Sequence, residues 1–151
     1  MAIAIRRATP LDQTVIAEFN QLMALETEGK ELDRDIVSAG VEAALKDPTK
    51  AWYFLAHEGE EVVGQLMITF EWSDWRNGWI WWIQSVYVRS DTRRRGVFRA
   101  LFDHIRTAAV QTPGIAGIRL YVEQDNEIAQ RTYERLGLDA TGYLVMERCP
   151  P

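Results

Sequence analysis

The sequence contains few of the residues that build disulfide scaffolds or zinc sites. Among its 151 residues there is one cysteine, Cys149, and there are two histidines, His57 and His104. One cysteine cannot close an intrachain disulfide, and these three residues lack the ligand spacing of a zinc site. We therefore expect neither a disulfide framework nor a bound metal.

Long apolar runs and an excess of basic residues are also absent. No apolar run reaches the roughly 20 residues that cross a bilayer, and MAIAIRRATP lacks the residue order of a signal peptide. The 17 Lys and Arg residues stand against 22 Asp and Glu residues, and the net charge of -5 argues against general nucleic-acid binding. The expectation is a cytoplasmic protein without a membrane or nucleic-acid partner.

What the sequence does contain is typical of a globular protein. Hydrophobic residues make up 47% of the chain and charged residues 26%, and a chain of this length can bury a core of its own. We predict a single domain over residues 1–151.

Hydrophobic periodicity and capping signals predict one strand and two helices before Pro48. Ile3 and Ile5 alternate with small or polar residues, as in a short strand. Thr9-Pro10-Leu11-Asp12 indicates a helix start, since Thr9 and Asp12 can form a capping box around Pro10. The first helix is expected to bury Val15, Ile16, Phe19, Leu22 and Met23, and the second Ile36, Val37, Val41, Ala44 and Leu45.

The rest of the chain begins with strands and then alternates helices and strands. Strands are predicted over 52–56, 62–70, 83–88, 115–122 and 143–146, with a two-residue hairpin turn at Asn77-Gly78. A helix over 126–136 follows one whose buried face is Val97, Leu101, His104, Ile105 and Ala108. The order βααβββαβαβ predicts an α/β fold with a mixed sheet flanked by helices.

The segment TRRRGVFRAL, residues 92–101, has the pattern of an anion site. A strand, a short basic glycine loop and an amphipathic helix place free backbone N–H groups and the positive end of the helix dipole together. Gly96 permits close approach to a phosphate, and the planar forks of Arg93, Arg94, Arg95 and Arg99 suit a diphosphate better than a carboxylate. The alternative is an exposed basic turn.

A second segment, NEIAQRTYERLG, identifies a family. With the loop, it resembles the GNAT superfamily of acyl-CoA N-acyltransferases, whose cofactor loop reads Arg/Gln-x-x-Gly-x-Gly/Ala after a strand ending in valine. Here Val88 precedes the loop from Arg93 to Phe98, and Phe98 departs from the small residue of the family. The second segment, Asn-x-x-Ala-x-x-x-Tyr-x-x-x-Gly, is matched at Asn126, Ala129, Tyr133 and Gly137.

The resemblance covers essentially the whole chain and implies a mostly antiparallel, twisted sheet and acetyl-CoA as acyl donor. The strand edge at Val86, Tyr87 and Val88 would bond the pantetheine amides and the thioester carbonyl, and the backbone from Arg94 to Arg99 would hold the pyrophosphate. Asn126 would bond the cofactor, with a helix cap as an equal alternative. The implied cofactor residues are Val86, Tyr87, Val88, Arg93, Arg94, Arg95, Gly96, Val97, Phe98, Arg99, Asn126 and Tyr133.

The implied chemistry needs a proton donor for the departing thiolate and a route for the proton of the amine. Tyr133 matches the family's donor, and the alternative for it is a core aromatic residue. Gln84 stands where some relatives carry a glutamate, and an amide cannot act as a base. Glu71 and Glu123 are candidate bases, and a water chain is the remaining route.

The acceptor is expected to be a small cationic primary amine. Glu71, Asp74 and the tryptophan faces around Trp72 suit a cation, and the resemblance places Glu26, Glu28 and Glu31 at the acceptor rim. The tryptophan hairpin is alternatively packed across strands, or it forms a homodimer contact. Two other functions stay open. One is a catalytically weak acyl-CoA sensor, and the other is a nucleic-acid binder, which the net charge disfavours.

Overall fold

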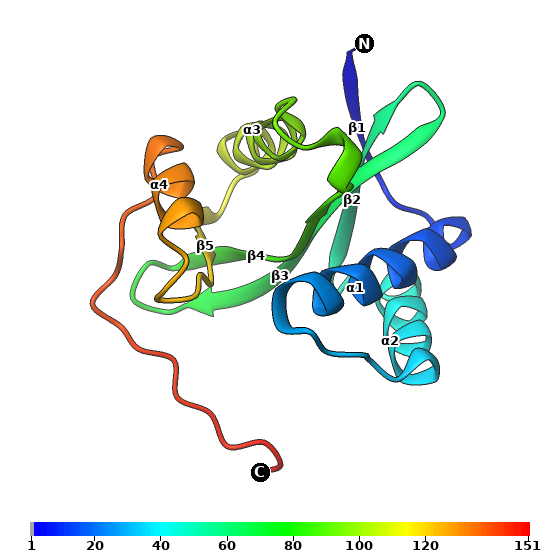
Figure 1. Ribbon diagram of the computed structural model, residues 1–151. Helices are drawn as coiled ribbons and strands as arrows, with labels where there is room; N and C mark the ends of the chain where they lie inside the picture. The colour runs from blue at the N-terminus through cyan, green and yellow to red at the C-terminus, as the bar shows by residue number, and fades with distance from the viewer. Residues whose placement is uncertain (1) are drawn as a thin grey trace. The chain divides into compact units, whose positions relative to one another are not determined.

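The computed structural model describes residues 2–151 (Figure 1). Internal contacts divide the chain into two units, a first unit that ends at Leu120 and a second unit, Tyr121–Pro151. Most of the predicted secondary structure lies in the first unit. No helix within residues 2–151 has the length and apolar character needed to cross a bilayer.

The first unit is built on a five-stranded sheet in the order β1-β2-β3-β4-β5. The strands are β1 (Ile3–Arg7), β2 (Trp52–Glu58), β3 (Glu61–Ser73), β4 (Gly78–Val88) and β5 (Ile115–Leu120). The first four are antiparallel neighbours, and β5 joins β4 in parallel. A parallel pair needs a crossover connection, which α3 (Val97–Gln111) supplies. The predicted mixed, mostly antiparallel sheet flanked by helices is confirmed.

Helices cover both faces of this sheet (Figure 1). Tyr53 and Leu55 of β2 lie in a core cluster with Ile16 of α1 (Gln13–Glu28) and Val41 of α2 (Arg34–Lys46). Successive side chains of a strand point to opposite faces, and Phe54 between them packs against α3, with its ring 5.4 Å from that of His104. The sheet is therefore a middle layer between α1 and α2 on one side and α3 on the other.

The first helix begins where the sequence predicts it. Pro10–Asp12 form a 3₁₀ turn that leads into α1. The buried Asp12 carboxylate accepts the Thr9 backbone N–H at 2.8 Å and two Arg6 guanidinium N–H bonds, both at 2.8 Å. The hydrogen bonds from Arg6 hold the pKa of Asp12 below its usual value. The carboxylate thus ties β1 to the start of α1.

Some local predictions were wrong. The β3–β4 connection has four residues, 74–77, because Asn77 takes the left-handed φ of 47° and Gly78 already pairs with Ser73. Ile16, Phe19, Val41 and Ala44 are buried as predicted, whereas Ile36 is 71% exposed at the first turn of α2. His104 is exposed on α3, and Phe102 and Ala109 are buried in addition to Val97, Leu101 and Ile105.

The packing of α3 depends on a glycine in β3. A Cβ built on Gly64 would lie 2.8 Å from Cγ1 of Val97 and 3.2 Å from the Tyr87 carbonyl oxygen. Val97 is the first residue of α3 and is 2% exposed. Gly64 therefore lets the start of α3 approach the sheet closely.

Two glycine-to-alanine changes are expected to shift stability in opposite directions. Gly64→Ala should lower the free energy of unfolding by about 1–3 kcal/mol, because the added methyl overpacks the α3 contact. Gly40→Ala, in α2 with nothing within 4 Å of the new methyl, should raise it by up to about 1 kcal/mol. Denaturant titration of both variants measures the two changes. A Gly64→Ala variant as stable as the wild type would contradict the close approach.

The second unit contains α4 (Glu127–Arg135). The Asn126 side chain caps it by accepting the Ala129 N–H at 3.1 Å, and Gly137 takes a left-handed φ of 92° after its end. The strand predicted over Tyr143–Met146 is absent. A strand exists only as part of a ladder, and residues 121–151 contain no other strand with which it could pair. The side chains of Tyr143 to Met146 are 69–92% exposed.

Candidate active site

The basic loop leads into the N-terminus of α3, as the sequence predicts. Arg94 and Gly96 take left-handed φ values of 64° and 80°. The first intrahelical bond runs from the Ala100 N–H to the Gly96 carbonyl oxygen at 3.0 Å, so the N–H groups of Val97 and Arg99 have no acceptor within the helix. Because free N–H groups and the helix dipole favour negative charge, this end of α3 suits a phosphate.

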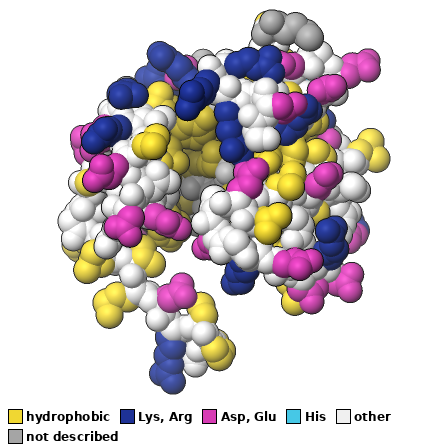
Figure 2. All heavy atoms as spheres, in the orientation of Figure 1, with side chains coloured by type: hydrophobic (Ala, Val, Ile, Leu, Met, Phe, Trp, Pro, Cys, Tyr) yellow, Lys and Arg dark blue, Asp and Glu magenta, His cyan; other side chains and the backbone are white. Residues whose placement is uncertain are grey.

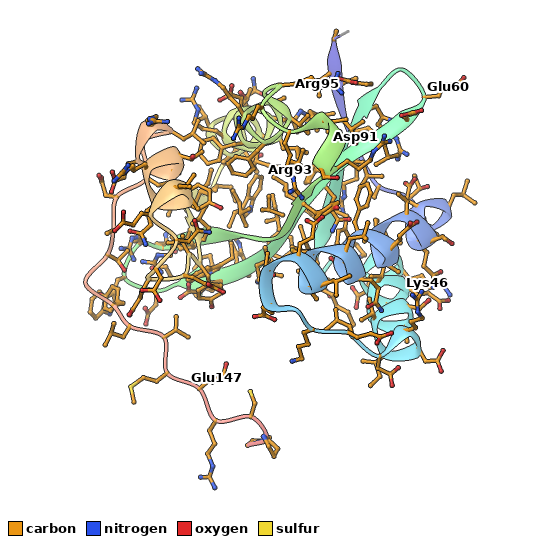
Figure 3. All side chains as sticks on the ribbon, viewed as in Figure 1. Lys46, Glu60, Asp91, Arg93, Arg95 and Glu147 are labelled. Carbon is orange, nitrogen blue, oxygen red and sulfur yellow. The ribbon has the colours of Figure 1, made fainter. Side chains whose placement is uncertain are left out.

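The loop arginines, of which Figure 3 labels Arg93 and Arg95, differ in what they contact. Arg93 pairs with Glu26 at 2.6 Å, Arg95 with Glu58 at 3.2 Å, and Arg99 with Asp103 at 3.7 Å. Arg94 makes no ion pair with any residue that the structure describes. Lys and Arg side chains gather over this part of the molecule in Figure 2, and Arg94 is the loop cation whose charge is not already matched by a carboxylate.

Arg93 connects α1 to the end of β4. Its Nε donates to the Val88 carbonyl oxygen at 2.9 Å, and a terminal nitrogen donates to Glu26. The Tyr87 hydroxyl donates to the other Glu26 oxygen at 3.3 Å. Burial, with the nearby Glu26 charge, raises the pKa of Tyr87. Glu26, expected at the acceptor rim, thus lies beside the basic loop.

The β4 strand changes course beside this loop. Gln65 pairs with Tyr87 and Met67 with Gln84, so β4 carries one more residue than β3 across the interval. Ser85 within it has a φ of 51°, which identifies a β-bulge. Pairing with β5 ends at Ile83. Within the first unit, residues 84–88 therefore have no strand partner on the β5 side, and this open edge contains the predicted Val86, Tyr87 and Val88.

Of the two candidate catalytic residues in the first unit, Gln84 lies at this edge and Glu71 does not. Gln84 adjoins the bulge, and its Nε2 donates to the Thr69 hydroxyl at 2.6 Å. Glu71 lies opposite Ile80, which is four residues, or roughly 13 Å of strand, from Gln84. One Glu71 oxygen accepts from Trp82 Nε1 at 2.8 Å and pairs with Arg119 at 3.2 Å. The structure thus gives Glu71 a cationic partner of its own.

The tryptophan hairpin contains both packed and exposed rings. Trp72 and Trp79 meet edge to face at 5.1 Å, and the buried Trp81 meets Trp52 at 5.6 Å. Cross-strand packing therefore accounts for these rings. Trp75, in the turn, is 88% exposed, and Asp74 beside it accepts the Trp75 N–H at 2.8 Å. Of the two other expected acceptor contacts, Trp72 is half-exposed and Glu28 is exposed at the last residue of α1.

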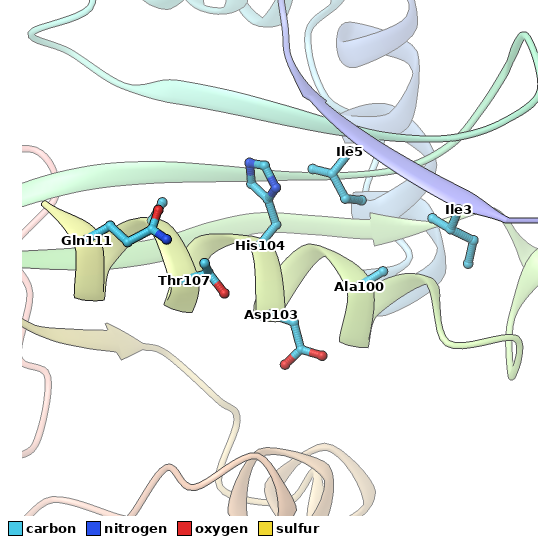
Figure 4. Close-up of a pocket in the computed structure, with 8 residues that line it drawn as sticks. Ile3, Ile5, Ala100, Asp103, His104, Thr107 and Gln111 are labelled. Atoms are coloured by element: carbon cyan, nitrogen blue, oxygen red, sulfur yellow. The ribbon is translucent and has the colours of Figure 1, made fainter.

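A hollow between β1 and α3 contains none of the predicted site residues. It has a volume of about 460 Å³ and is lined by Ile3 and Ile5 of β1 and by residues of α3 that include His104 (Figure 4). No group of three or more His, Cys, Asp and Glu side chains within residues 2–151 is arranged to hold a metal ion.

In the second unit, Asn126 acts as a helix cap, which was one of its two predicted roles. Burial raises the pKa of the Tyr133 phenol above its usual value. Because its pKa is raised, Tyr133 remains a protonated hydrogen-bond donor at neutral pH. Glu123 is exposed, and its backbone oxygen accepts from the Gln130 side chain at 2.9 Å.

Comparison with known proteins decides the family. A model of the acetyltransferase (GNAT) family matches residues 16–138. The chain belongs to the GNAT family. The match includes the open edge of β4, the loop and α4, and it extends across Leu120 into the second unit. Phe98, the departure from the GNAT loop pattern, is half-buried with its ring 6.3 Å from that of Phe102.

Solved structures resemble this GNAT chain over nearly its whole length. A possible acetyltransferase from Clostridium difficile 630 is 46% identical, covers 98% of this chain and 97% of its own, and has a TM-score of 0.92. A predicted acetyltransferase with acetyl-CoA from Clostridium acetobutylicum is 16% identical over 97% and 96% of the two chains, with a TM-score of 0.78. The second similarity shows the fold alone. No curated protein matches the chain.

The residues that sequence reasoning missed are polar and buried. Gln65 and Asn20 are 0% and 8% exposed and are hydrogen-bonded to each other at 3.0 Å. Gln65 interrupts an apolar run from Val62 to Phe70, and that interruption was the available signal. The left-handed φ of Ser85 had no comparable signal in the sequence. Arg94 was predicted as a cofactor residue, but its lack of an ion pair within residues 2–151 was not.

Proposed function

We propose that this GNAT chain is an N-acetyltransferase that transfers an acetyl group from acetyl-CoA to a small cationic primary amine. The observation that carries the proposal is the open edge of β4, which runs directly into the loop that leads to the N-terminus of α3. A strand edge offers amide-bonding groups, and a helix N-terminus offers an anion site. An acyl donor with an amide-containing arm and a diphosphate needs both.

The donor-binding roles follow from this arrangement. The N–H groups of Val97 and Arg99, with Arg94, which makes no ion pair within residues 2–151, would hold the pyrophosphate. Backbone groups of Val86 to Val88 would bond the pantetheine amides and the carbonyl of the thioester that acetyl-CoA supplies. The side chains of Arg93 and Arg95 would brace the loop through Glu26 and Glu58 instead of contacting phosphate.

The proposed transfer is a direct attack by the amine in a ternary complex. Tyr133 would donate its proton to the departing sulfur. Gln84, held by Thr69, would orient the amine or a water molecule without acting as a base. Glu71 is disfavoured as the base by its ion pair with Arg119, which leaves Glu123 or a water chain to take the proton.

The acceptor side of the proposal rests on exposed carboxylates and an exposed tryptophan face. Glu26 lies beside the β4 end, and Glu28, Trp72 and Asp74 are exposed. A solved structure with the same fold is an aminoglycoside acetyltransferase in complex with sisomicin, at 15% identity, 97% and 94% coverage and a TM-score of 0.76. The single domain, the homodimer and the cytoplasmic location stay predictions.

Thermal unfolding with ligands tests the donor half of the proposal. Acetyl-CoA and CoA at 100 times their dissociation constants should each stabilise the protein by about 2.7 kcal/mol, because they bind only the folded state. RNA should produce no shift. If neither acetyl-CoA nor CoA at saturation raises the melting temperature, the donor site is wrong.

Release of free thiol from acetyl-CoA in the presence of a panel of amines tests the acceptor half. Cationic primary amines should give the fastest release. A preference for anionic or neutral acceptors would overturn the acceptor assignment. Ligand-induced stabilisation without thiol release from any amine would favour the acyl-CoA sensor.

A further inference from the structure

Gln65 is a fully buried polar side chain in the middle of β3, with an exposed fraction of 0%. Its Nε2 donates to Asn20 Oδ1 at 3.0 Å and to the Ser85 carbonyl oxygen at 3.1 Å. Its Oε1 has no hydrogen-bond partner among residues 2–151. Turning the amide over would set Oε1 against the Ser85 carbonyl, acceptor against acceptor. The bond to Ser85 therefore fixes the orientation of Gln65, although one buried oxygen is left unpaired.

The residue that Gln65 contacts is the strained residue of the β4 bulge. Ser85 has a φ of 51°, a conformation that is unfavourable for a residue with a Cβ and persists only where the surroundings hold it. The extra residue in β4 interrupts the ladder with β3 at this point. Gln65 supplies a side-chain N–H to the Ser85 carbonyl at that interruption, so the bond holds the peptide in its bulged orientation.

The same contact links the bulge to α1 and β2. Asn20, on α1, is 8% exposed and accepts from Gln65. Burial raises the pKa of Tyr53 on β2, and a hydrogen bond from Asn20 offsets part of that rise. Tyr53, Asn20, Gln65 and the Ser85 carbonyl thus form a buried polar chain from β2 to the strand edge. Removing Tyr53's hydroxyl would alter this chain at the end away from β4.

We propose that Gln65 is a positioning residue that holds the Ser85 peptide and thereby shapes the open edge of β4, residues 84–88, for the carbonyl of an acyl donor. The structural half of this inference stands on the contacts of Gln65. The functional half rests on the proposed donor site. Hydrogen exchange of the ligand-free protein tests the structural half, and the infrared spectrum of bound acetyl-CoA tests the functional half.

Hydrogen exchange of the ligand-free protein tests the structural half. In Gln65→Met, which keeps the side-chain length and removes both N–H donors, peptides covering residues 84–88 should exchange at least about tenfold faster than in the wild type. Peptides covering residues 79–83, which pair with β5, should stay within about twofold. Tyr53→Phe is the matched control and should leave residues 84–88 unchanged. Equal exchange over 84–88 in Gln65→Met and the wild type would overturn the proposal.

The infrared spectrum of bound acetyl-CoA with a ¹³C-labelled acetyl carbonyl tests the functional half. In the wild type, hydrogen bonding at the β4 edge should lower the frequency of the thioester carbonyl stretch relative to free acetyl-CoA. Gln65→Met should lose this shift while it still binds acetyl-CoA. Adding Ser85→Gly to Gln65→Met should restore the shift, because glycine adopts a positive φ without the cost that Gln65 offsets.

The pattern of results separates a positioning role from general destabilisation. A shift that is lost in Gln65→Met and not recovered by Ser85→Gly would overturn the positioning role. If Gln65→Met does not fold, Gln65→Glu serves instead. Its protonated carboxyl can donate one bond to Ser85, so the protection factor over 84–88, relative to the intrinsic exchange rate at each pH, should rise as the pH falls. A protection factor that does not change with pH would contradict the proposal. Absence of acetyl-CoA binding by the wild type would remove the donor site and leave the exchange result to decide the structural half.

Discussion

Tyr133→Phe is expected to lower turnover about 10²-fold or more while leaving the affinity for acetyl-CoA unchanged. A departing thiol has a pKa of about 8.5 and an ordinary tyrosine about 10, and burial raises the pKa of Tyr133 further. The phenol therefore stays protonated at neutral pH and can donate to the sulfur. Phenylalanine keeps the ring that packs and removes only the hydroxyl group that carries that proton.

Steady-state kinetics and calorimetric titration with acetyl-CoA measure the two parts of this prediction. Because the donor form is lost as the pH rises through a raised tyrosine pKa, the wild-type rate should fall on the alkaline side, and Tyr133→Phe should lack that fall. Tyr143→Phe, the same chemical change at a side chain 75% exposed in the second unit, is the control. Wild-type turnover in Tyr133→Phe would remove Tyr133 from the proposed mechanism.

The parts of the structure that the sequence predicted well depend on short-range signals. Thr9, Pro10 and Asp12 lie within four residues and mark the start of α1 by local hydrogen bonding and the fixed φ of proline. Gly96 follows a strand and precedes an apolar helix face, and it takes the positive φ that only glycine adopts easily. Neighbouring residues determine local geometry of this kind, so the loop and α3 were predictable.

The parts that the sequence did not predict depend on contacts between distant residues. Arg93, Arg94 and Arg95 look equivalent in the chain, and only the positions of Glu26 and Glu58 leave Arg94 as the unpaired cation. The bulge at Ser85 arises from the register between β3 and β4, which no local pattern specifies. Tyr143 to Met146 has the composition of a strand, but a ladder partner decides whether a strand forms.

Arg94→Gly is expected to weaken binding of acetyl-CoA about 10- to 100-fold, the loss that corresponds to one charge-assisted hydrogen bond to phosphate. The same change should raise the free energy of unfolding by about 0.5–1 kcal/mol. A residue with a Cβ pays about 1–2 kcal/mol in the left-handed region, and the greater freedom of glycine in the unfolded chain offsets part of this. Arg94 has a φ of 64°, so glycine fits its conformation without strain.

A fall in acetyl-CoA affinity together with a rise in the free energy of unfolding distinguishes a functional cation from a surface arginine. S-acetylpantetheine, which lacks the pyrophosphate, should bind Arg94→Gly and the wild type equally. Arg106→Gln removes one positive charge from the exposed side of α3, about 13 Å of helix from Val97, and should leave acetyl-CoA affinity within about twofold. If Arg94→Gly binds acetyl-CoA as tightly as the wild type, the backbone N–H groups of α3 hold the pyrophosphate without it. If the affinity falls and the stability rises, the chain keeps a strained arginine in the loop because that position is where its charge reaches the phosphate.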